Sequence, residues 1–129
     1  MKTENSQTTL NTAYFLNGTL ENITLELLIS TKGQTSTSVI SLDDIPINES
    51  PLKGDVFLTL GSNAKLDKKV LRITTIITDT SRESIHTGII VKIQGGLGDK
   101  EFPLQEDVLE EGDSVVYSII IRFKKFISI

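Results

Sequence analysis

The chain has 129 residues, a formal charge of −4 and no cysteine. This length suits one domain with one hydrophobic core. The lack of cysteine excludes disulfides, thiolate nucleophiles and Cys-ligated metal sites. The acidic charge argues against a nucleic-acid or anionic-membrane partner, because phosphate binding needs clustered Lys and Arg. No apolar run approaches the roughly 20 residues that cross a bilayer, so we expect a soluble domain without a membrane span.

Composition predicts an all-β fold. The chain contains 17 Ile, 15 Thr and 7 Val but only 2 Ala. β-Branched side chains suit a pleated, half-buried surface, whereas Ala is the best helix former. We therefore expect strands to dominate a single domain over residues 1–129, with a polar N-terminal arm at 1–7.

The first half of the chain predicts four strands. Apolar and polar residues alternate up to Leu16, and Asn17-Gly18 then favours a tight hairpin turn, because both of its central positions need positive φ. Further strands are predicted at 21–30, 34–42 and 55–60. Residues 43–54 hold two of the three prolines and indicate an irregular crossing between sheets.

The second half predicts three more strands and one short helix. The strands are expected at 69–79, 85–94 and 114–126. A glycine-rich turn at 95–98 precedes a segment, 103–111, that has Pro near its start, acids in its first turn and Gly112 past its end. These signals predict a short helix near 103–111.

Seven strands with mostly one apolar face predict an antiparallel β-sandwich. Two sheets packed face to face bury such faces economically in a chain too short for a large ligand-holding barrel. The order of the strands cannot be deduced from alternation, so immunoglobulin-like, jelly-roll and C2-like topologies all remain open.

Several aliphatic residues interrupt the polar sides of the predicted strands. They are Leu28, Ile76, Ile90, Val116 and Ile120. If their strands share a sheet, they line up on its outer face, where either the 103–111 segment or a second subunit covers them. The chain's last residues, Phe126, Ile127 and Ile129, raise the same alternative of packing under the sandwich or on a neighbour.

Other motifs are weaker. The acidic residues Glu106, Asp107, Glu110, Glu111 and Asp113 resemble a calcium-binding segment only in charge, and a solvated acidic surface is the favoured interpretation. Gly95-Gly96-Leu97-Gly98 lacks the Gly-Lys-Ser/Thr of a phosphate loop and is interpreted as a turn. His86 is the single histidine, and its place on the polar side of a strand favours an ordinary surface residue. We expect no catalytic residue, cofactor or metal.

These observations favour a non-enzymatic structural or interaction module. The outer-face aliphatics and the apolar end of the chain suggest a self-associating or assembly subunit, such as those of virions, injection machines or surface layers. Its partners are then a second copy or another protein of a larger assembly. The start of the chain lacks a signal-peptide pattern, so we expect a cytoplasmic or particle-assembled protein. The alternative is a carbohydrate- or small-ligand-binding sandwich, with or without calcium.

Overall fold

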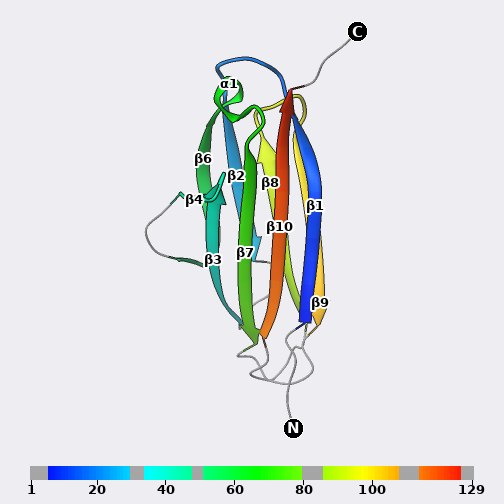
Figure 1. Cartoon of the computed structure of the whole chain (residues 1–129). Helices are drawn as coiled ribbons and strands as arrows, with labels where there is room; N and C mark the ends of the chain where they lie inside the picture. Colours follow the sequence, from blue (N-terminus) through cyan, green and yellow to red (C-terminus); the bar gives the residue numbers. More distant parts are fainter. Residues whose placement is uncertain (1–5, 30–33, 48–50, 80–85, 108–113, 126–129) are drawn as a thin grey trace.

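The chain folds into two layers of strands. The computed structural model describes residues 6–29, 34–47, 51–79, 86–107 and 114–125, and Figure 1 shows the long strands lying roughly along one common axis. The strands are β1 (Ser6–Leu16), β2 (Asn22–Ile29), β3 (Gln34–Leu42), β4 (Ile45–Pro46), β5 (Leu52–Lys53), β6 (Val56–Ser62), β7 (Val70–Asp79), β8 (His86–Gln94), β9 (Lys100–Asp107) and β10 (Ser114–Lys125). A four-residue helix, α1 (Asn63–Leu66), follows β6.

Consecutive strands repeatedly cross from one sheet to the other. The predicted hairpin at Asn17-Gly18 is therefore wrong, because β1 and β2 lie in different sheets and do not pair. One sheet, here called the β10 sheet, has the order β1–β10–β7–β3–β4, with β5 also paired to β3; the β2 sheet has the order β6–β2–β8–β9. All pairs are antiparallel except β1 and β10, which run parallel from Ser6 opposite Val115 to Leu16 opposite Lys125. The predicted all-β sandwich is confirmed, and the structure supplies the strand order.

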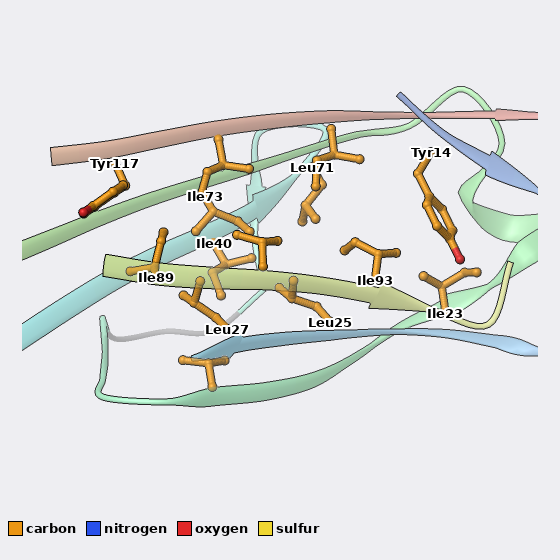
Figure 2. Packing of buried hydrophobic residues seen from close by; sticks show 14 of the residues in the cluster. Tyr14, Ile23, Leu25, Leu27, Ile40, Leu71, Ile73, Ile89, Ile93 and Tyr117 are labelled. Carbon is orange, nitrogen blue, oxygen red and sulfur yellow. The ribbon is translucent and has the colours of Figure 1, made fainter. Parts of the chain in front are cut away.

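The core lies between the two sheets and follows the predicted alternation. In β10, Val115, Tyr117 and Ile119 are buried, while the residues between them are only half-buried. Figure 2 shows Leu71 of the β10 sheet and Leu25 of the β2 sheet among the side chains that fill this space. Because both sheets present β-branched and leucine side chains at every second position, each strand buries one face and leaves the other outside.

Polar groups inside the core are paired with one another. Ser38 Oγ and Thr75 Oγ1 lie 2.8 Å apart on neighbouring strands. The Oγ1 atom of Thr87 is 2.6 Å from Tyr117 Oη and donates to the carbonyl oxygen of Glu106 at 2.5 Å. These hydrogen bonds remove the cost of burying hydroxyl groups without a partner.

The predicted helix near 103–111 is wrong, because its first part is strand β9. Residues from Lys100 to Asp107 pair with β8, with Ile93 opposite Lys100 and His86 opposite Asp107. β9 is an edge strand, where Pro103 is tolerated because a strand at an edge has one side without a ladder partner. The alternation of half-buried and exposed side chains therefore prevails over the proline and acidic signals. Residues 108–111 of the predicted helix lie outside the described residues.

The other predicted strands are confirmed to within a few residues, with three additions. The crossing at 43–54 contains the two-residue strands β4 and β5, and α1 was not predicted. β1 begins at Ser6, so the predicted polar arm ends earlier than expected. Ser62 caps α1 by accepting a hydrogen bond from the Lys65 amide at 3.2 Å.

A buried asparagine joins three connections at the end of the sandwich that carries α1. Asn63 is fully buried; its Nδ2 donates to the carbonyl oxygens of Glu21 and Gly95, both at 2.9 Å, and its Oδ1 accepts from the Asn17 amide at 2.9 Å. Asn17 in turn donates to the carbonyl oxygen of Gly96 at 3.2 Å. The glycine-rich segment is thus the β8–β9 turn, held against β1 and α1.

We predict that Gly96→Ala destabilises the protein whereas Gly98→Ala does not. A Cβ at Gly96 would lie 2.5 Å from the Tyr14 ring, while a Cβ at Gly98 meets nothing within 4 Å. The first change should lower the free energy of unfolding in urea by about 1–3 kcal/mol. The second should stay within about 0.5 kcal/mol of the wild type. Equal effects of the two changes would contradict this account of the turn.

Candidate interaction surface

The structure divides the five predicted outer-face aliphatics between the two sheets. Ile76, Val116 and Ile120 lie on the outside of the β10 sheet, and Leu28 and Ile90 lie on the outside of the β2 sheet. The condition that their strands share one sheet is therefore not met. The prediction of an interface through these residues remains a prediction, now with two separate faces to consider.

On the β2 sheet, an apolar patch runs across three strands. Leu28 is directly opposite Ile90, and Ile90 is directly opposite Pro103 of β9. On a fourth strand, β6, Phe57 is 64% exposed and directly opposite Glu26, which is two residues from Leu28 along β2. We call these four apolar residues the outer patch. Sequence reasoning missed Phe57, although it interrupts the polar side of its strand just as Leu28 does.

Beside the outer patch, charges of alternating sign form a row across the same strands. Glu26 of β2 is opposite Lys92 of β8, and Lys92 is opposite Glu101 of β9. We call these three residues the charged row. Within the described residues, the ion pairs shorter than 4.0 Å are Lys69 with Asp43 and Arg72 with Asp44, so the charged row contains none. Its charges are therefore available to a partner.

The outside of the β10 sheet has a different character. Val116 is directly opposite Ile76, which is 43% exposed, and Thr37 continues the same row on β3. Serine and threonine hydroxyls surround these aliphatics. Arg72 and Arg122 both lie on this side, and Arg72 is 3.5 Å from Asp44. This surface combines aliphatic, hydroxyl and basic side chains, and Val39 on β3 is also 49% exposed.

The predicted internal cover over the aliphatics is not provided by residues 103–107. These residues extend the β2 sheet as β9 instead of lying across an outer face. The other residues of the predicted cover, and the apolar residues Phe126, Ile127 and Ile129, lie outside the described residues. β10 ends at Lys125, beside Leu16 of β1.

A slot of about 440 Å³ opens where the edge strands β1 and β9 meet. Its lining residues are Thr12, Ala13, Tyr14, Phe15, Leu97, Gly98, Lys100 and Phe102. The amide of Leu97 donates to the carbonyl oxygen of Phe15 at 3.0 Å, which brings the β8–β9 turn against β1. The slot is mostly apolar and carries one cationic side chain, that of Lys100.

A second cavity, of about 500 Å³, gathers basic residues that are distant in sequence. It is lined by Asp67, Lys68, Lys69, Val70, Arg122, Phe123, Lys124 and Lys125. Lys69 is 3.5 Å from Asp43, and Arg122 donates to the side-chain oxygen of Asn11. Backbone hydrogen bonds between Phe123 and residues 68 and 69 hold the end of β10 against the α1–β7 connection and so place these basic residues together.

The residues considered for catalysis or metal binding show no convergent site in the described ranges. No group of three or more His, Cys, Asp or Glu side chains that would hold a metal occurs among the described residues. Of the acidic segment 106–113, the side chain of Glu106 is described, and its Oε2 accepts from Thr8 Oγ1 at 2.9 Å. His86 begins β8, opposite Asp107.

Comparison with known proteins supplies no relative. Family models, curated proteins and solved structures were each searched, and none of the three comparisons found a match. In the described residues, none of the helical structure has the length and apolar character needed to cross a membrane.

The hydroxyl of Tyr14, at the wall of the slot, has a shifted pKa. Burial raises the pKa above its ordinary value of 10.0; the hydrogen bond from the Gly96 amide, 2.9 Å away, lowers it, and the charge of Asp99 raises it, with a net increase. The folded state therefore holds the phenolic proton more tightly than the unfolded state. This contribution to stability is complete below pH 10 and is lost as the pH rises above it.

We predict that Tyr14→Phe weakens the alkaline loss of stability. At neutral pH the variant should lose about 1 kcal/mol of unfolding free energy, because the Gly96 amide loses its acceptor. Between about pH 9 and 11, its unfolding free energy should fall less than that of the wild type. Urea denaturation across this range measures both effects, and parallel curves would contradict the assigned pKa shift.

Proposed function

We propose that this protein is a non-enzymatic structural module that self-associates, as an assembly subunit does, through an outer sheet face. The supporting observation is the outer patch, in which Leu28, Ile90 and Pro103 lie side by side across three strands next to the exposed ring of Phe57. Contiguous exposed apolar groups with a polar surround are typical of protein–protein contacts.

The energetics favour covering this patch. Each aliphatic side chain that becomes fully buried contributes about 1.5–3 kcal/mol. Leu28 and Ile90 are already half-buried in the isolated chain, so each would contribute only part of this amount. Phe57 has more surface left to bury. Protein interfaces are enriched in aromatic residues, and Phe57 is the exposed aromatic residue of the outer patch.

The slot between β1 and β9 supports a second candidate function, the binding of a small apolar ligand. Its volume of about 440 Å³ falls within the range of roughly 300–1,000 Å³ that is usual for ligand sites. Its exposed Phe15 and Leu97 offer apolar contact. Stacking of a sugar on tyrosine is disfavoured, because Tyr14 and Tyr117 are buried in the core.

We predict that the wild type forms an oligomer that Ile90→Lys disrupts. Light scattering after size-exclusion chromatography over a concentration series should give at least twice the 14.2 kDa mass of one chain. Ile90→Lys places a charge in the outer patch, whereas Ile76→Lys makes the same change on the other sheet and serves as the control. A chain shortened after Lys125 tests the contribution of the C-terminal residues.

Two results would contradict the proposal. A mass of one chain at every concentration would refute self-association. An oligomer that Ile76→Lys disrupts and Ile90→Lys leaves intact would refute the role of the outer patch.

The ligand-binding candidate predicts a different result. A panel of small apolar compounds and sugars should include one that raises the melting temperature of the wild type but not of Leu97→Glu, which puts a carboxylate at the mouth of the slot. Leu20→Glu, at an 82% exposed leucine away from the lining residues, is the matched control. A stabilisation that survives Leu97→Glu would exclude the slot as the site.

A further inference from the structure

We infer that the outer face of the β2 sheet is a two-fold interface between two copies of this chain, in which Glu26 of each copy faces Lys92 of the other. The inference rests on the proposed self-association and names its surface, its symmetry and its charge pairs. It is carried by the register of β2 and β8 together with the order of charges along the charged row.

The register puts two matched rows at the same heights on neighbouring strands. Glu26 is directly opposite Lys92, and two residues further along β2, Leu28 is directly opposite Ile90. All four side chains are on the outer face, since the residue between them on β2, Leu27, is buried in the core. On these two strands, Glu26 with Lys92 and Leu28 with Ile90 therefore form two neighbouring pairs, each with one residue on β2 and one on β8.

A two-fold axis parallel to the strands and midway between β2 and β8 makes both rows self-complementary. The rotation places β2 of one copy over β8 of the other and does not change the position of any residue along the strand direction. Leu28 then meets Ile90 of the second copy, and Glu26 meets its Lys92. Because the operation is two-fold, every contact occurs twice. Strands of the two copies stay aligned, which is the usual arrangement of packed sheets.

An axis that lies along either of these strands opposes like charges. An axis along β8 would place Lys92 against Lys92 of the second copy, and Glu26 against Glu101 of the second copy. An axis along β2 would place Glu26 on Glu26. Like charges face to face in an interface are unfavourable. An axis between β8 and β9 would pair Lys92 with Glu101, but β9 is the edge of the sheet, so Glu26 and Leu28 on β2 would have no strand opposite them. The axis between β2 and β8 is the position that pairs opposite charges and also covers Leu28 and Ile90.

The outer strands fall at the rim of this arrangement. β6 of one copy lies over β9 of the other, and because Phe57 is directly opposite Glu26, its ring lies at the height of Glu101 of the second copy. Glu101, on the same edge strand, is exposed and has Lys92 opposite it in its own sheet.

The β10 sheet offers no equivalent charge pattern. The charged side chains described on the outside of β7 and β10 are Arg72, Arg122 and Lys124, all of one sign. Two such faces would repel each other when packed together. The outer face of the β2 sheet, with an acid and a base at equal height on adjacent strands, is the better self-complementary surface.

Charge reversal tests the pairing directly. Glu26→Lys and Lys92→Glu should each raise the dimer dissociation constant about 100-fold or more, because each puts like charges in two symmetry-related contacts. The double variant should restore the wild-type constant. An equimolar mixture of the two single variants should also form a dimer, since every contact in that heterodimer is again between opposite charges. Sedimentation equilibrium measures all four.

Matched controls separate the interface from net charge and folding. Glu21→Lys in an exposed turn and Lys124→Glu on the other sheet repeat the two charge changes away from the interface and should leave the dissociation constant within about twofold of the wild type. Thermal unfolding of each single variant, compared with its control, checks that the folded state persists.

The outcomes distinguish this inference from the function on which it rests. Dissociation by both single variants, with recovery in the mixture and the double variant, supports the two-fold pairing. If both single variants remain oligomeric with the wild-type dissociation constant, the pairing is overturned while self-association stands. The same holds if neither the double variant nor the mixture restores the dimer. A wild type that is monomeric at every concentration overturns both.

Discussion

Every long strand of this protein must bury alternate side chains against the opposite sheet, and the other features depend on that constraint. Val115, Tyr117 and Ile119 meet it in β10, as do Leu25 and Leu27 in β2. Because consecutive strands cross repeatedly between layers, each sheet is built from segments that are far apart in the chain. The composition of each outer face is therefore decided by which strands become neighbours, and not by local sequence.

The crossings create an end of the sandwich where several connections meet, and a buried amide organises it. Asn63 satisfies its donors and its acceptor with backbone groups of two turns. Gly96 adds a close approach of the β8–β9 turn to Tyr14. A buried polar network with all partners present specifies one arrangement, because any other would leave polar groups unpaired. The same contacts hold the turn that forms one wall of the slot between β1 and β9.

The two outer faces differ in a way that limits how copies assemble. The β2 sheet carries charges of alternating sign beside its outer patch, while β7 and β10 carry basic side chains on theirs. An isologous contact closes after two copies. If the proposed dimer forms, growth beyond a pair would require a second surface, and the outside of the β10 sheet, with Val116 opposite Ile76, would be that surface.

The period-2 pattern of β-branched residues was sufficient to predict the all-β class and most strand positions, because alternation reflects local backbone geometry. It also identified Leu28 and Ile90 as outward-facing, but neither their opposition nor the pairing of Glu26 with Lys92. Residues near 103–111 were misassigned because proline and acids suit a helix start as well as an edge strand. Strand order, register and the two separate faces were decided only by the tertiary structure, since hydrogen bonding between distant strands leaves no periodic signal in either strand alone.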